Sequence, residues 1–182
     1  MKDISLHILD VAQNSISAGA KNILIEIDEN RKTGKMKIII DDNGRGMPPE
    51  IVQQVTDPYY TTRTTRKVGL GLPLFKQSAM LTGGNLFIES QPGKGTRVTV
   101  EFDMNHIDCL PMGDMPGVIM ILVGGTSGIE WTYRHKVNDK EYVFDTHEVK
   151  EALDGLDIRD PAVIKYLREM IRENLIELRS GA

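Results

Sequence analysis

The sequence predicts an α+β fold, a two-layer α/β sandwich with helices on one face of a mixed, mainly antiparallel sheet, plus a small C-terminal α+β unit. Apolar residues recur at helical spacing near the N-terminus, and alternating strand patterns come in pairs joined by short turns. A segment rich in Asp, Pro, Met and Gly then interrupts the chain. We therefore expect a domain over 1–104, a linker over 105–116 and a second unit over 117–182.

The first domain is expected to begin with a helix and a two-stranded hairpin. Apolar residues recur every three or four positions over 2–18, and Gly19 supplies a stop. Residues 23–27 alternate apolar and polar, as in a half-buried strand, whereas 36–40 are more continuously apolar, as in a buried strand. A turn over 30–35 joins them.

The rest of the first domain should contain two helices and a second hairpin. Two prolines open a short helix over 48–55, and a longer one runs from Leu70 to the glycine pair 83–84. The alternation over 85–90 and 96–102 predicts two strands joined by a glycine-bearing turn.

The second unit is expected to be a small sheet with two helices. Strand patterns cover 117–123, 129–137 and 141–144. Asp145 and Asp160 are placed as helix N-caps. The apolar stripe of the last helix should pack on this unit's own sheet, and a partner protein is the alternative that could cover it.

Composition narrows the function classes. The net charge is −4 with both signs interspersed, which argues against a nucleic-acid or anionic-membrane partner. The longest apolar run, 118–123, is far shorter than the roughly 20 residues that span a bilayer. A single cysteine, Cys109, fits a reducing compartment, so we expect a cytoplasmic protein. His106 and Cys109 are spaced like two metal ligands, but one such pair is weak evidence for zinc.

Two short polar side chains share a face of the first helix. Asp10 and Asn14 are four residues apart, so both project the same way. An amide oxygen suits Mg²⁺, and a neighbouring carboxylate could deprotonate an attacking hydroxyl. A solvated helix face explains the pair equally simply.

A second polar group follows the strand at 36–40. Asp42 stands at its end, and Gly44 and Gly46 allow the backbone to approach a flat ligand. A carboxylate there can accept a hydrogen bond from the exocyclic amine of adenine. An ordinary turn also accounts for the Asn-Gly pair.

A third group opens the helix at Leu70. Gly69 and Gly71 would leave backbone N–H groups free for phosphate oxygens at the positive end of the helix dipole. The preceding 61–67 concentrates hydroxyls and three cations, as a lid over a triphosphate would require. An ordinary basic loop is the alternative interpretation.

The order of these motifs is more specific than any one of them. Asn14 on a helix, then 42–46, 57–63, 69–72 and 90–96, resembles the ATP-binding domain shared by gyrase, heat-shock chaperones, histidine kinases and MutL. The resemblance covers residues 1 to about 103 and implies the Bergerat-type ATP-binding fold.

The resemblance implies ATP and Mg²⁺ as ligands. Asn14 would ligate magnesium, Asp42 would hold the adenine amine, and Thr96 would support Asp42 through water. The implied nucleotide-binding residues are Asn14, Asp42, Gly44, Gly46, Met47, Thr62, Arg63, Lys67, Gly69, Leu70, Gly71, Leu72 and Thr96.

Two departures from the family pattern affect the expected chemistry. Position 10 is Asp where MutL and the chaperones have a glutamate that activates water, so Asp10 is the expected catalytic base, one methylene shorter. Asn14 comes so early that we expect no upstream dimerisation hairpin bearing a phosphoacceptor histidine. The chain is thus not expected to be a complete sensor kinase.

The sequence leaves three functions open. The first is a regulatory protein kinase or ATPase acting in trans on a partner protein, as the short anti-sigma-factor kinases do. The second is a nucleotide-gated interaction module with little turnover, and the third is a MutL-like ATPase. The partner would meet the lid over 61–67 or the C-terminal unit.

Overall fold

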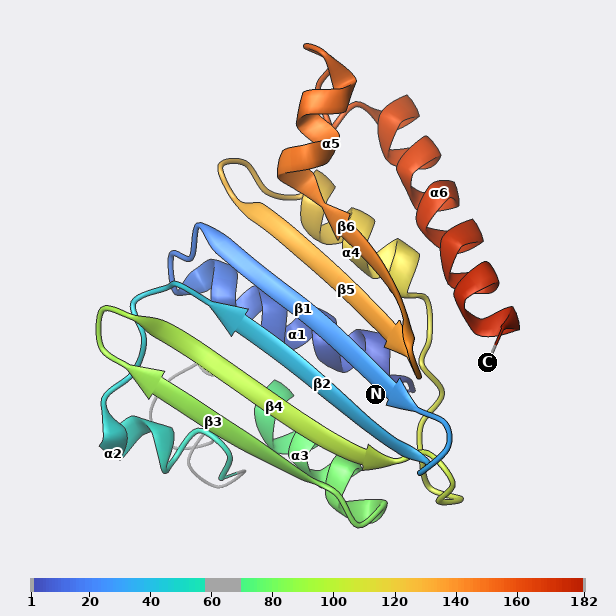
Figure 1. The fold of residues 1–182 in the computed structure, drawn as a ribbon. Coiled ribbons are helices and arrows are strands. Elements are labelled where there is room, and N and C mark those ends of the chain that lie inside the picture. The colour runs from blue at the N-terminus through green and yellow to red at the C-terminus, as the bar shows by residue number, and fades with distance from the viewer. Residues whose placement is uncertain (1, 58–69, 182) are drawn as a thin grey trace.

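One six-stranded sheet organises the molecule, with helices packed against it (Figure 1). The computed structural model describes residues 2–57 and 70–181. The strand order is β3-β4-β2-β1-β5-β6, and neighbouring strands are antiparallel except for the parallel pair β1 and β5. The predicted mixed, mainly antiparallel sheet is confirmed. The described elements are α1 (Ile4–Ser17), β1 (Asn22–Asn30), β2 (Lys35–Asp42), α2 (Pro49–Val52), α3 (Gly71–Leu81), β3 (Asn85–Gln91), β4 (Gly95–Asp103), α4 (Met115–Gly124), β5 (Glu130–Val137), β6 (Lys140–Asp145), α5 (Thr146–Leu153) and α6 (Pro161–Ser180).

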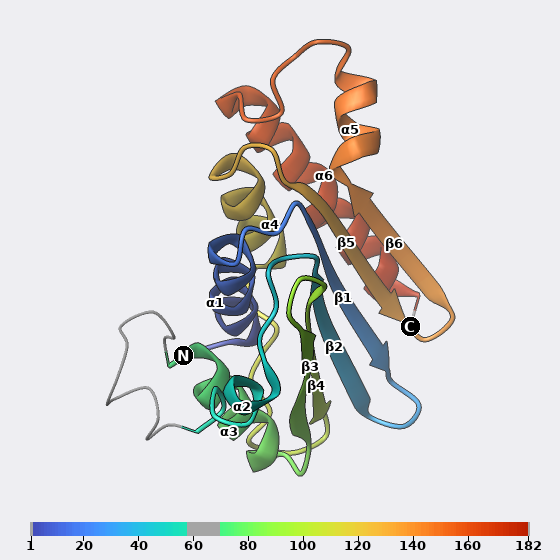
Figure 2. The ribbon, with the colours of Figure 1, turned by 90° about the vertical axis from the view of Figure 1, so that its left-hand side faces the viewer.

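The core lies between one face of the sheet and a layer of helices. Ile23, Ile25 and Ile27 of β1 are buried on this face, and the residues between them are half-buried on the other. Figure 2 shows α1, α3 and α4 against the sheet, and α6 contacts α4, β5 and β6. The period-2 burial of the strands therefore explains why the helices gather on one side.

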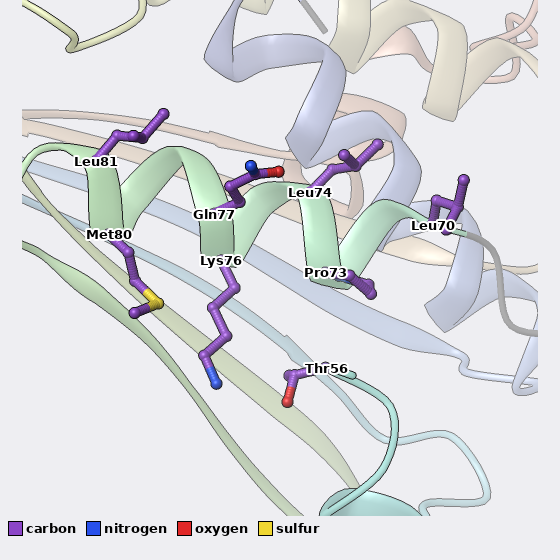
Figure 3. Close-up of a pocket in the computed structure, with 8 residues that line it drawn as sticks. All are labelled: Thr56, Leu70, Pro73, Leu74, Lys76, Gln77, Met80 and Leu81. Atoms are coloured by element: carbon purple, nitrogen blue, oxygen red, sulfur yellow. The ribbon is translucent and has the colours of Figure 1, made fainter. Parts of the chain in front are cut away.

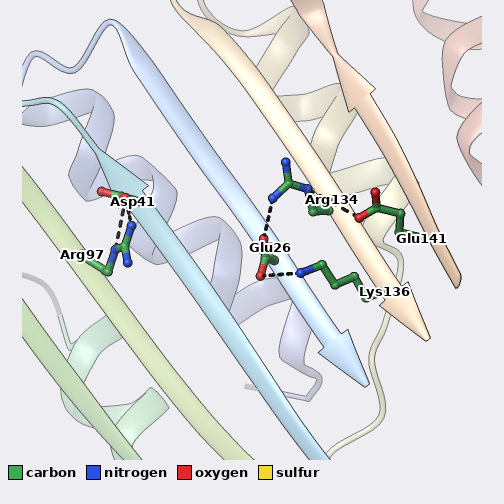
Figure 4. A network of polar contacts seen from close by, with 6 residues as sticks. All are labelled: Glu26, Asp41, Arg97, Arg134, Lys136 and Glu141. Carbon is green, nitrogen blue, oxygen red and sulfur yellow. Dashed lines mark hydrogen bonds and ion pairs between the residues drawn. The ribbon is translucent and has the colours of Figure 1, made fainter. Parts of the chain in front are cut away.

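The opposite face of the sheet carries charged pairs between adjacent strands (Figure 4). Glu26 of β1 accepts a 3.0 Å hydrogen bond from Arg134 of β5, directly opposite it, and lies 3.5 Å from Lys136. Asp41 and Arg97, opposite each other on β2 and β4, pair at 2.6 Å. Partly exposed pairs of this kind add only modest stability. They leave this face polar and solvated.

The strand expected over 117–123 is wrong, because these residues lie in helix α4. Asp114 caps the helix by accepting from the Gly117 N–H at 2.9 Å, and Pro116 lies in the first turn. The helix packs between α1 and α6, so nearly all its sides are apolar. A short apolar run carries no period that separates a buried helix from a strand. Among the described helices, none has both the length and the apolar character to cross a bilayer.

The expectation that the C-terminal strands form a sheet of their own is also wrong. β5 pairs with β1 over eight positions, from Asn22 opposite Glu130 to Glu29 opposite Val137, and β6 extends the same sheet. The expected linker is anchored too, since Ile4 N–H donates to the Pro111 carbonyl at 3.0 Å. The strands and helices after residue 104 therefore complete the core. A division of the chain at 104 and 117 into separate units stays a prediction.

His7 on α1 belongs to this core. Its ring is 1% exposed, stacks on Phe75 at 4.8 Å, and lies 3.1 Å from the hydroxyl of Ser78 through Nε2. The other ring nitrogen has no hydrogen-bond partner among the described residues. Burial lowers the pKa of His7 to about 4. The folded protein therefore holds this imidazole neutral well below the pKa of an exposed histidine.

We predict that His7 makes folding stability depend on pH between about 6.5 and 4. In this window the unfolded chain binds a proton that the folded protein does not, so the free energy of unfolding falls as the pH falls. His7→Gln should flatten this dependence, measured by urea titrations across the window. His147→Gln, which changes an exposed histidine, is the control. Its free energy of unfolding should depend on pH as steeply as that of the wild type. An unchanged slope in His7→Gln would contradict the assignment.

Candidate functional site

A cavity of about 200 Å³ opens between α1, the end of β2, α2 and the start of α3. Six residues predicted from the sequence meet on its walls, namely Asn14, Asp42, Gly46, Met47, Leu72 and Thr96. Val11, Ile51, Val55 and Val98 add an apolar surface. The cavity thus combines apolar walls with a few converging polar groups, as small-molecule sites do.

The carboxylate of Asp42 is held from both sides. Asp42 ends β2 and is 8% exposed. Its Oδ2 accepts from the hydroxyl of Ser15 at 2.6 Å, and its Oδ1 accepts from the Gly44 N–H at 2.9 Å. Hydrogen bonds to an ionised group are short and strong, so the side chain is fixed in one orientation.

Ser15 is a site residue that the sequence analysis missed. It is 3% exposed on the apolar face of α1, four residues after Val11. A serine on that face, next to Asn14, was the available signal, because buried hydroxyls need a hydrogen-bond partner.

The glycines after β2 are required by close backbone contacts. A Cβ on Gly44 would lie 2.9 Å from the Ala18 carbonyl oxygen. Gly46 has φ +69°, and a Cβ there would run into the carbonyl oxygen of Gln91. Between them, the Arg45 N–H donates to Ala18 O at 2.9 Å, and the Arg45 carbonyl accepts from Gly93 N at 2.7 Å. This loop is therefore held between the end of α1 and the β3–β4 turn.

Thr96 lies directly opposite Asp42 in the pairing of β2 with β4. Its hydroxyl is 2.8 Å from that of Ser90, which also accepts from the Met47 N–H at 2.8 Å. Ser90, also unpredicted, thus links the Gly46 loop to β4. Support of Asp42 by Thr96 through water stays a prediction.

Asp10 and Gly71 do not line this cavity, but they meet next to it, where α1 abuts the start of α3. A Cβ on Gly71 would lie 3.2 Å from the Cβ of Asp10, so the start of α3 abuts α1 at this residue. Among the described residues, no side chain caps the first turn of α3. The N-terminus of a helix presents N–H groups and a positive dipole end that favour an anion. Burial raises the pKa of the Asp10 carboxyl above the ordinary value of 3.8.

The remaining predicted residues are not brought to this cavity by the described structure. Thr62, Arg63, Lys67 and Gly69 lie outside the described residues. Leu70 is 52% exposed and lines a separate groove of about 500 Å³ along α3, with Leu74, Met80 and Leu81 (Figure 3). That groove is larger, but its described lining residues include no carboxylate.

Residues 2–106 match the family model described as "Histidine kinase-, DNA gyrase B-, and HSP90-like ATPase". The chain belongs to this family. Membership agrees with the predicted resemblance and gives the chain an ATP-binding domain, in which Asp42, Asn14 and Gly71 stand on the elements described above.

Two curated relatives of this chain are named as kinases. The chain is 29% identical over 108 residues to "Putative sensor histidine kinase NtrY-like" of Rickettsia conorii, covering 59% of this chain and 18% of the relative. It is 33% identical over 88 residues to "Sporulation kinase C" of Bacillus subtilis, covering 48% and 20%. The matched region is thus about a fifth of the length of these relatives.

A solved structure extends the fold comparison. The "N terminal domain of a DNA repair protein" aligns with TM-score 0.53 and 16% identity, covering 79% of this chain and 52% of that chain. Residues 2–106 alone cannot supply 79% of the chain, so the shared fold includes part of the segment after β4. At this identity the likeness concerns the fold alone.

We predict that Gly46→Ala destabilises the protein more than Gly19→Ala. Both glycines have positive φ, and the conformational cost for alanine is about 1–2 kcal/mol. A Cβ on Gly19 meets nothing within 4 Å, whereas one on Gly46 meets Gln91. Chemical denaturation should therefore show a larger loss for Gly46→Ala. Equal losses would mean that the loop does not pack on Gln91 as described.

Proposed function

We propose that this chain binds Mg-ATP and acts as a regulatory protein kinase or ATPase on a partner protein. The observation that carries the proposal is the buried, doubly hydrogen-bonded Asp42 in a cavity that Asn14 also lines. Family membership and the similarity to proteins named as kinases support it.

In this proposal Asp42 selects the base. A carboxylate accepts hydrogen bonds and donates none, so it pairs with the exocyclic amine of adenine. The apolar walls formed by Met47, Ile51 and Val98 would cover the faces of the ring. Gly44 and Gly46 keep the loop backbone close to Ala18 and Gln91 and leave the cavity open.

The residues present suit magnesium held mainly by phosphate and water. Among residues 2–57 and 70–181, no group of three or more His, Cys, Asp or Glu side chains could hold a metal. Mg²⁺ in nucleotide sites typically takes one or two protein oxygens and keeps several waters. The amide oxygen of Asn14 would be such a ligand. When bound, magnesium neutralises the charge of the phosphates.

We place the phosphates at the start of α3. The N-terminus of α3, which begins at Gly71, would present its first N–H groups and a positive dipole end beside Asp10. Thr62, Arg63, Lys67 and Gly69 stay proposed contacts from the sequence.

Asp10 would then act as a general base on a hydroxyl or a water. Phosphoryl transfer depends mainly on positioning and charge neutralisation, so a single carboxylate near the phosphates is enough to orient the nucleophile. Labelling with [γ-³²P]ATP separates the two outcomes: a kinase labels a discrete protein in a lysate, and an ATPase releases free phosphate. The partner surface, over 61–67 or 117–182, is likewise a proposal.

We predict that Asn14→Ala and Asp42→Asn each remove the stabilisation given by Mg-ATP. At 100-fold excess over the dissociation constant this stabilisation is about 2.7 kcal/mol in the unmodified protein. Asp139→Asn, in the exposed β5–β6 turn, is the control and should keep it. Thermal denaturation with and without Mg-ATP measures the effect. Full stabilisation in both site variants would refute the nucleotide assignment.

We predict that Asp10→Asn abolishes turnover and spares ATP binding. A general base works when deprotonated, so turnover should fall as the pH falls, with a midpoint above the ordinary aspartate pKa of 3.8. Phosphate release measured against pH tests this, with Asp139→Asn as the control. Undiminished turnover in Asp10→Asn would exclude Asp10 as the base.

A further inference from the structure

We propose that Ser15 is a positioning residue that gives this cavity its preference for a 6-amino purine over a 6-oxo purine. The proposal rests on the proposed function, because it concerns how Asp42 meets the base. Ser15 acts through Asp42 and is not itself assigned a contact with the nucleotide.

The hydroxyl of Ser15 donates its hydrogen bond to Asp42. A buried helical serine commonly donates to the carbonyl four residues earlier on its own helix. Ser15 instead donates across 27 residues to Oδ2 of Asp42, at 2.6 Å, from a position that is 3% exposed. The hydrogen bond therefore joins α1 to the end of β2 at the wall of the cavity.

Counting donors and acceptors shows what this bond leaves available. Each carboxylate oxygen accepts two hydrogen bonds. Ser15 takes one position on Oδ2, and the Gly44 N–H takes one on Oδ1. With its orientation fixed by two donors from two elements, Asp42 presents only acceptor positions to a ligand. An amine N–H can fill one of them.

A 6-oxo purine meets the opposite situation. Its carbonyl oxygen would face the largely buried carboxylate of Asp42 with no proton between them. Sites that are built to hydrogen-bond one group reject the analogue that cannot do so. Rejection of the 6-oxo purine requires that the carboxylate of Asp42 keeps a fixed orientation. Ser15 supplies one of the two bonds that prevent this rotation.

Loss of the hydroxyl should therefore change selectivity as well as affinity. The Ser15–Asp42 hydrogen bond is present without nucleotide, so its loss affects binding through the orientation of the carboxylate. Ser15→Ala should weaken ATP binding more than inosine triphosphate binding, so the ratio of the two dissociation constants moves toward one.

Calorimetry with Mg-ATP and Mg-inosine triphosphate on the full chain tests the proposal. Ser5→Ala is a matched control, because Ser5 is also buried on α1 and also donates to an aspartate, Asp3, at 2.6 Å. It should keep the wild-type ratio. Ser15→Cys, with a weak donor, should give a ratio between those of wild type and Ser15→Ala.

The ratios of the two dissociation constants distinguish a positioning role of Ser15 from a purely structural one. A narrowed ratio in Ser15→Ala, with Cys intermediate and Ser5→Ala unchanged, supports the role of Ser15. A Ser15→Ala protein that is less stable without nucleotide but keeps the ratio shows a purely structural serine and overturns the inference. If Ser15→Ala does not fold, an unchanged ratio in Ser15→Cys overturns it. Wild-type protein that binds neither nucleotide overturns the proposed function itself.

Discussion

The buried carboxylate of Asp42 is the constraint around which the nucleotide half of the molecule is arranged. A charge at the end of a central strand is costly to bury unless it accepts hydrogen bonds. The structure meets this requirement with one donor from α1, Ser15, and one from the following loop, Gly44. Both donors must be in place at once, so the position of α1 and the path of the loop depend on each other. The glycines and the Arg45 backbone bonds keep that path fixed.

A second buried charge, Glu29, connects the C-terminal segment to the sheet. Glu29, at the end of β1, is 5% exposed and accepts from His135 of β5 at 2.8 Å and from Arg179 of α6 at 3.3 Å. Burial raises the pKa of Glu29, but the hydrogen bond from His135 and the charges of His135, Arg179 and Arg31 outweigh it and hold the pKa below its ordinary value. The last turn of α6 is thereby tied to the sheet. This network and the parallel pairing of β5 with β1 make the C-terminal segment part of the same core.

The sequence predicted the helix with Asp10 and Asn14, both hairpins and the loop of Gly44 and Gly46, because each depends on neighbours in the chain. Periodicity placed α1 within two residues of its observed ends. Periodicity did not identify the helix at 117–123. This helix is enclosed by α1 and α6 and is apolar on nearly every side, so its sequence lacks the alternation of apolar and polar residues that reveals a helix. The role of Ser15 was not predicted for a related reason, since its hydrogen-bond partner Asp42 is 27 residues away in the sequence.

The sequence by itself determined the local parts of the site: which residues share a helix face, where backbone must approach closely, and which polar groups follow a strand. Only the tertiary structure decided which of these meet. It placed Thr96 opposite Asp42, Gly71 against Asp10, and β5 beside β1, where the sequence placed β5 in a separate unit. The physical reason is that periodicity and turn chemistry act over a few residues. Strand register and side-chain partners depend instead on burial shared between distant segments.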